Sequence, residues 1–195
     1  MKIYGMDMMQ YLKWNDGNKY DGSQINPSWA FREFAVKDST IVSWVGPMDI
    51  QSDNLIDYED VGLDIKGNKM LHFIVEHFDE QPGNLRLIYH RQRLLVMITR
   101  DILKDYSVDT TQDGDDIFID NKKLSVSIAS ASISSMKIHF ALNVTTQGTP
   151  DDVETSALED NMDMNELSAL QDKIANEYIH FMDDIEKDIT KTKVF

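Results

Sequence analysis

Residues 114–144, GDDIFIDNKKLSVSIASASISSMKIHFALNV, decide the fold of this chain. They predict two strands joined by small polar residues, because side chains along a strand point alternately to opposite faces. In the first strand we expect one face to hold Leu124, Val126 and Ile128, and the other Lys123, Ser125, Ser127 and Ala129. In the second strand we expect one face to hold Ile138, Phe140, Leu142 and Val144, and the other His139, Ala141 and Asn143. If the aliphatic faces form the core, the reverse face is a low polar floor on which a ligand could lie.

The composition is that of a globular protein with an acidic surface. The chain has 195 residues and a formal net charge of −15. Such a charge disfavours nucleic acid and anionic membranes as partners, because both attract basic surfaces. The length predicts a single domain over residues 1–195, with a core over 1–160 and an amphipathic C-terminal helix within 161–195 packed on it.

The chain has no cysteine, which excludes disulfides, thiolate zinc sites and thiol nucleophiles. It also has no apolar run of about 18 residues that would span a membrane. The first sixteen residues lack the features of a signal peptide. We therefore expect a cytoplasmic protein without a membrane partner.

The remaining elements predict an α+β fold, with a mixed, mainly antiparallel sheet flanked by helices. A β-branched run over residues 40–45 ends at a Gly-Pro turn signal, and residues 70–78 form an apolar strand suited to the centre of a sheet. Helical spacing of apolar residues predicts a helix over 84–106 and a last helix after Asp163, which forms a capping box with Glu166.

Three side chains have both a structural and a functional interpretation. Arg91 lies within the apolar stripe of the first long helix, so its stem covers apolar surface or its guanidinium binds a carboxylate or phosphate. Lys123 follows a predicted tight turn at Asp120 and Asn121, where lysines commonly protect a sheet edge. His139 fits a general base, a ligand contact or a buried hydrogen-bonded histidine. The histidine and carboxylate spacings predict no metal site.

Three segments resemble the second half of the lipoate/octanoate transferase and biotin–lipoate ligase superfamily. They are KKLSVSIAS (122–130), KIHFALNV (137–144) and VETSALED (153–160). The resemblance implies a fold like the catalytic domain of class II aminoacyl-tRNA synthetases. It also implies that Lys123 contacts an acyl carbonyl or an acyl-adenylate, and that His139 is the histidine of the family's second strand.

Over its whole length the chain resembles an archaeal and bacterial family known as domain of unknown function 366. The similar segments are WVGPMDI (44–50), LHFIVEHFD (71–79), RQRLLV (91–96) and KKLSVSIA (122–129). This resemblance implies the same fold and supplies no activity.

Two departures from the ligase superfamily limit the mechanism. The absence of cysteine excludes thiol-dependent acyl transfer. No Arg- and Gly-rich nucleotide loop is evident in residues 46–70. Use of ATP therefore stays possible only if Arg91 or Arg93 contacts the phosphates from another part of the chain.

Two classes of function remain. One is an enzyme acting on a small carboxylate or acyl compound: Lys123 stabilises negative charge on oxygen, His139 assists as acid or base, and Arg91 anchors an anionic group. The polar floor with Ser125, Ser127 and Asn143 would complete its ligand surface. The other is a non-catalytic domain that binds a metabolite or a protein. Exposed strand edges and the last helix are compatible with a homodimer.

Overall fold

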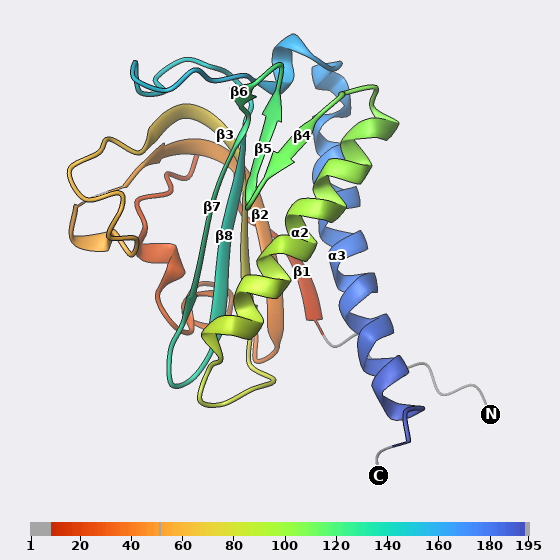
Figure 1. Ribbon diagram of the computed structural model, residues 1–195. Helices are drawn as coiled ribbons and strands as arrows, with labels where there is room; N and C mark the ends of the chain where they lie inside the picture. Colours follow the sequence, from red (N-terminus) through yellow and green to blue (C-terminus); the bar gives the residue numbers. More distant parts are fainter. Residues whose placement is uncertain (1–8, 51, 194–195) are drawn as a thin grey trace.

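A five-stranded sheet forms the centre of the computed structural model, which describes residues 9–50 and 52–193 (Figure 1). The strand order is β1-β2-β3-β8-β7, with β1 parallel to β2 and the other pairs antiparallel. The bounds are Met9–Lys13 for β1, Ser39–Asp49 for β2, Lys66–His77 for β3, Ser125–Ala131 for β7 and Met136–Asn143 for β8. A small second sheet holds β4 (Thr111–Asp113), β5 (Asp116–Ile119) and β6 (Lys122–Lys123). The α+β prediction is confirmed. The N-terminal segment that was examined for a signal peptide begins with residues 1–8, which lie outside the described residues.

Two long helices, α2 (Leu85–Asp105) and α3 (Leu167–Thr190), cover one face of the sheet side by side (Figure 1). The α2 helix begins as predicted, because the Asn84 side chain accepts a hydrogen bond from the Leu87 N–H at 3.1 Å. Asp163 instead caps a 3-10 turn, η4 (Met164–Glu166), directly before α3. The other short helices are η1 (Ser23–Ile25), α1 (Trp29–Phe34), η2 (Ser52–Asn54) and η3 (Leu158–Asp160). No helix in the described residues is long and apolar enough to cross a bilayer.

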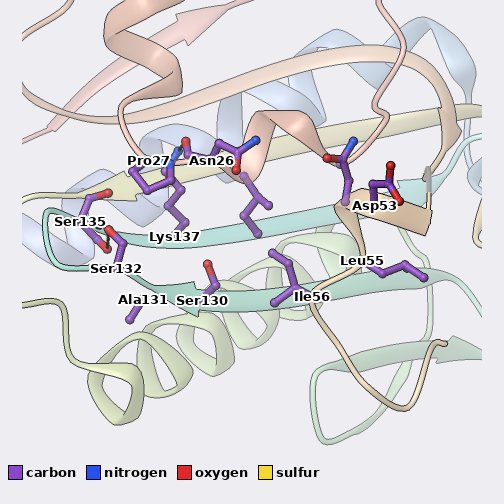
Figure 2. Close-up of a pocket in the computed structure, with 13 residues that line it drawn as sticks. Asn26, Pro27, Asp53, Leu55, Ile56, Ser130, Ala131, Ser132, Ser135 and Lys137 are labelled. Atoms are coloured by element: carbon purple, nitrogen blue, oxygen red, sulfur yellow. Dashed lines mark hydrogen bonds between the residues drawn. The ribbon is translucent and has the colours of Figure 1, made fainter.

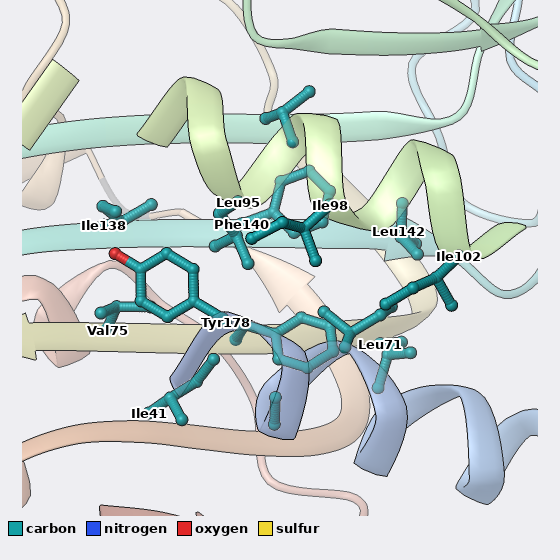
Figure 3. Close-up of a cluster of buried hydrophobic side chains, with 14 of the residues drawn as sticks. Ile41, Leu71, Val75, Leu95, Ile98, Ile102, Ile138, Phe140, Leu142 and Tyr178 are labelled. Carbon is teal, nitrogen blue, oxygen red and sulfur yellow. The ribbon is translucent and has the colours of Figure 1, made fainter. Parts of the chain in front are cut away.

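The main core lies between this sheet face and the two helices (Figure 3). Its members are aliphatic and aromatic side chains from the strands and helices, among them Ile41, Leu71, Val75, Leu95, Ile98, Ile138, Phe140, Leu142 and Tyr178. The predicted central strand, β3, lies in the middle of the sheet, and from Met70 to His77 the side chains on both of its faces are buried.

The reverse face of the sheet is closed by a second, aromatic cluster. Trp14, Trp29 and Trp44 meet there with ring centroids 5.1 to 6.2 Å apart. Tyr20, on the segment between β1 and η1, is also part of this cluster and is 1% exposed. The sheet is therefore covered on both sides, and the reverse face is only partly available to a ligand.

The predicted faces of β7 are inverted. Ser125 pairs with Leu142 and Ser127 with Phe140, whereas Val126 and Ile128 pair with Ala141 and His139. Directly paired residues of antiparallel strands point to the same face, so the serines face the helices and the aliphatic residues face the reverse side. The physical reason is α2, which packs on β7: the small serine side chains leave room for it, and Gln92 of α2 donates a hydrogen bond to Ser127 Oγ at 2.7 Å.

The Gly-Pro pair at 46–47 does not end β2. The strand continues to Asp49 through a register shift between Gly46 and Met48, which is a β-bulge. A Cβ on Gly46 would lie 2.0 Å from the backbone oxygen of Asn18, so glycine is needed where these two segments meet.

Candidate functional site

Lys123 is held at the mouth of a cavity by the backbone on both sides of it. Asp120 and Asn121 both have positive φ (50° and 63°), as the predicted tight turn requires. The Lys123 N–H donates to the Glu154 carbonyl at 2.8 Å, and the Ser156 N–H donates to the Lys123 carbonyl at 2.9 Å. The half-buried ammonium lies 2.8 Å from Asp116 Oδ2. The side chain is therefore both positioned and charged.

The cavity beside Lys123 has a volume of about 350 Å³ and an acidic lining. Its floor includes Val126, Ile128, His139 and Asn143. Seven carboxylates line it: four from the loop between β2 and β3 (Asp57, Glu59, Asp60, Asp64), two at the start of β5 (Asp115, Asp116), and Asp152 after β8. Only two lysines, Lys66 and Lys123, balance them. No group of three or more potential ligands is arranged to hold a metal ion in the described part of the chain.

His139 is a buried, hydrogen-bonded histidine in the wall of this cavity. Its Nε2 lies 3.1 Å from His72 Nδ1, and His72 Nε2 lies 3.1 Å from the Gly46 carbonyl oxygen. A carbonyl only accepts, so His72 is protonated at Nε2 and its Nδ1 accepts from His139 Nε2–H. The Tyr20 ring stacks on His139 with centroids 3.6 Å apart. Burial holds the pKa of His139 well below its usual value and lowers that of His72 to about 3, so both rings are neutral.

The other predicted ligand residues have structural partners. Ser125 Oγ accepts from the Ile117 N–H at 2.8 Å, and Ser127 Oγ is bonded to α2 as described. The Asn143 amide nitrogen donates to the carbonyls of Lys123 and Ser156, at 3.2 and 3.1 Å. Asn143 therefore fixes the backbone that carries Lys123, and of these three it is the one whose side chain shares the face of His139.

Arg91 does not join Lys123 and His139. It makes two hydrogen bonds, of 2.8 and 2.6 Å, to the carboxylate of Asp79 on the helical side of the sheet. There it lines a separate cavity of about 340 Å³ with His77 and residues of α3. The guanidinium of Arg91 therefore pairs with a carboxylate of the protein itself, and it lies apart from the Lys123 cavity where it was expected to anchor a ligand. Arg93 likewise pairs with Asp115 at 3.2 Å.

A second lysine on the reverse face, Lys137, was missed at the sequence level. It is buried, its Nζ lies 3.3 Å from Glu76 Oε2, and it donates to the carbonyl of Asn26. Glu76 Oε1 accepts from the Ser28 N–H and from Ser135 Oγ, at 2.6 and 2.8 Å. Figure 2 shows Lys137 beside a cavity of about 320 Å³. Two signals were available: period 2 places Lys137 on the face of His139, and a carboxylate inside an apolar strand needs a partner.

Comparison with known proteins gives a family and a fold. The family model described as "Domain of unknown function (DUF366)" matches residues 9–193. An uncharacterized protein of Methanocaldococcus jannaschii is 34% identical, covering 98% of this chain and 87% of its own length. The structure of a protein of unknown function from Pyrococcus horikoshii superposes with a TM-score of 0.88 at 32% identity, covering 96% of this chain and 99% of the other.

More distant structures share the fold alone. A putative lipoate protein ligase from Thermoplasma acidophilum, solved with lipoic acid, has a TM-score of 0.61 at 14% identity and covers 88% of this chain and 86% of its own. Structures of the biotin protein ligase from Aquifex aeolicus give TM-scores of 0.55 to 0.58 at 14–16% identity, covering 91–92% of this chain and 72–73% of theirs. The predicted biotin/lipoate ligase-like fold is confirmed.

Proposed function

The chain belongs to the family of unknown function DUF366, and we propose that it binds a small carboxylate or acyl compound in the Lys123 cavity and acts on its carbonyl group. One observation carries this proposal: a positioned ammonium lies at the mouth of a cavity, on a fold shared with ligases of lipoate and biotin. An ammonium aimed at a carbonyl oxygen stabilises the negative charge that develops there during acyl transfer.

The residues of the cavity limit how such a reaction would run. No cysteine is present, so no acyl thioester forms on the chain. His139 lines the cavity, but it is neutral, its Nε2–H is bonded to His72 and its ring is stacked on Tyr20, so we assign it no proton transfer in this conformation. Lys123 is therefore the residue we assign to the acyl oxygen, and Asn143 positions it through its backbone.

ATP, which the fold family implies, does not fit these residues. A triphosphate needs a positive surface. The cavity has seven carboxylates, both of its lysines are paired with aspartates, and Arg91 and Arg93 are paired with Asp79 and Asp115. We derive no step through ATP.

The test is calorimetric titration with octanoate, lipoate and biotin, followed by an assay for hydrolysis or transfer of an octanoyl thioester. We expect one of the carboxylates to bind, and Lys123→Ala to abolish turnover. Lys122→Ala is the matched control, because the adjacent lysine is exposed and lies outside the cavity lining. If none of the three carboxylates binds, or if Lys123→Ala and Lys122→Ala behave alike, the proposal is wrong.

A second candidate function is non-catalytic binding of the same class of compound. The observation that favours it is that His139 is buried and stacked on Tyr20, so the cavity has no accessible imidazole base. Binding that depends on Lys123, in a wild-type protein without turnover of the thioester, would select this candidate over the enzyme.

A further inference from the structure

A groove opens on the helical side of the sheet, between the first turns of α2 and the last turns of α3, where the two helices diverge (Figure 1). It is the cavity of about 340 Å³ beside Arg91, and its apolar wall is formed by Leu87, Leu94, Met182, Ile185 and Ile189. Ile185 and Ile189 are 42% and 59% exposed, and Phe181, one turn before Ile185, is 42% exposed. Apolar side chains that gather on an exposed helix face typically mark a surface for a partner.

The two helices that flank this groove have opposite charge. The α2 helix contains five lysines and arginines and two aspartates, whereas α3 contains two lysines and six aspartates and glutamates. Residues seven apart lie on the same face of a helix. The outer side of α2 has a basic row at this spacing: Arg86, Arg93 and Arg100. The outer side of α3 has an acidic row: Glu177, Asp184 and Asp188. All six residues are exposed or half-buried.

The basic and acidic rows lie at matching levels along the two antiparallel helices. Lys173 Nζ lies 2.6 Å from Asp105 Oδ2, so the first turns of α3 are level with the last turn of α2. Both helices rise by the same distance per residue. The members of the two rows are therefore level to within about one turn, in the pairs Arg100–Glu177, Arg93–Asp184 and Arg86–Asp188.

From this arrangement we propose that the outer face of α2 and α3 is the interface of a homodimer. A two-fold axis parallel to the helices lays α2 of each copy on α3 of the other, as a symmetric interface requires. Each basic row then faces an acidic row of the other copy, and the two apolar grooves meet between them. A second copy matches this surface better than a partner of one charge sign, because the surface carries both signs side by side.

The area of this face is sufficient for a specific dimer. The 21 residues of α2 give a helix about 30 Å long, and α3 is slightly longer. Two such helices, each about 10 Å wide, present about 600 Å² on each copy, near the lower end of specific interfaces. The face lies on the side of the sheet opposite the floor of the Lys123 cavity, so this inference does not depend on the proposed function.

Sedimentation velocity at about 50 μM protein tests the interface, at a concentration where a dimer of micromolar affinity is populated. We expect a species of twice the 22.4 kDa mass of the chain. Phe181→Glu should weaken the dimer about a hundredfold, because it brings a carboxylate into the apolar contact from both copies. Tyr58→Glu is the matched control and should leave the dimer unchanged, since Tyr58 is 94% exposed in the loop between β2 and β3, across the sheet.

A charge swap tests the pairing of the two rows. Arg86→Glu and Asp188→Arg should each weaken the dimer about tenfold, because each change places like charges together at two symmetric positions. The double variant should recover most of this loss. Arg86 is chosen because Arg93 and Arg100 already pair with Asp115 and Asp101. Both substitutions also suit the charge preference of their helix ends, so the variants should fold.

Three results would overturn the proposal. One is a wild-type protein that is monomeric at about 50 μM. Another is a dimer that Phe181→Glu leaves intact, which would place the interface on a different surface. The third is a double variant that dimerises no better than Arg86→Glu or Asp188→Arg alone.

Discussion

Replacing Lys137 with methionine should destabilise the fold strongly. Lys137 and Glu76 are 2% and 0% exposed at the side chain and face each other across the β3–β8 pair. Methionine fills much of the same volume but leaves the Glu76 carboxylate with only two hydrogen bonds, from Ser28 and Ser135. It also removes the hydrogen bond from Lys137 to the carbonyl of Asn26, which links the segment before α1 to the sheet.

The expected loss is about 3–5 kcal/mol of unfolding free energy, the usual cost of leaving one partner of a buried ion pair uncompensated. The double variant Glu76→Gln/Lys137→Met should lose less than the single variant Lys137→Met. Its glutamine oxygen can still accept from Ser28 and Ser135, and no unpaired charge remains.

Urea unfolding at neutral pH, followed by circular dichroism, measures these differences. The control is Lys104→Met on α2, which breaks an exposed pair with Asp101 and should cost less than about 1 kcal/mol. The reasoning is refuted if Lys137→Met costs no more than this control. It is also refuted if the double variant loses the sum of the two single variants.

Three further predictions concern stability. Lowering the pH from about 7 to 5.5 should reduce the free energy of unfolding by about 1.3 kcal/mol for each of three buried neutral histidines, or by about 4 kcal/mol in all. Burial lowers the pKa of these histidines in the folded protein, so only the unfolded chain takes up protons between these two pH values. These histidines are His72, His77 and His139. Urea unfolding of the protein at both pH values measures the loss. Gly46→Ala should cost about 1–3 kcal/mol in thermal unfolding, because its Cβ would meet the Asn18 oxygen. Asn143→Ala should cost about 1–3 kcal/mol, since it removes the two hydrogen bonds from the Asn143 side chain to the carbonyls of Lys123 and Ser156; an unchanged melting temperature would contradict this.

The elements of the fold were predictable where a local pattern determines them. Apolar spacing located α2, and the continuous apolar run of β3 identified the central strand. The orientation of β7 was not predictable in the same way, because its serines and its aliphatic residues alternate equally well in either direction. Only the approach of α2 decides which of the two sets lies under a helix.

The candidate site was partly predictable. The tight turn at Asp120 and Asn121 before Lys123 was predictable, and the structure places Lys123 at a cavity. The placement of Arg91 depends on Asp79, which follows β3 and precedes the helix, so their contact is a property of the tertiary fold. The cover over His139 comes from Tyr20, more than one hundred residues away in sequence, and no local pattern links the two.

Lys123 and Lys137 have opposite charge environments, and we expect this difference to separate a role in ligand binding from a role in stability. The ammonium of Lys137 is paired with one carboxylate and donates hydrogen bonds to backbone carbonyls, so its charge is compensated within the fold. Lys123 shares its surroundings with more carboxylates than cations. Residues 53–56 of the loop after β2 line the Lys137 cavity, whereas the acidic residues 57–64 line the Lys123 cavity. Under the proposed function, selection between ligands should therefore depend mainly on the acidic half of this loop, and Lys123 should set the position of the carbonyl group.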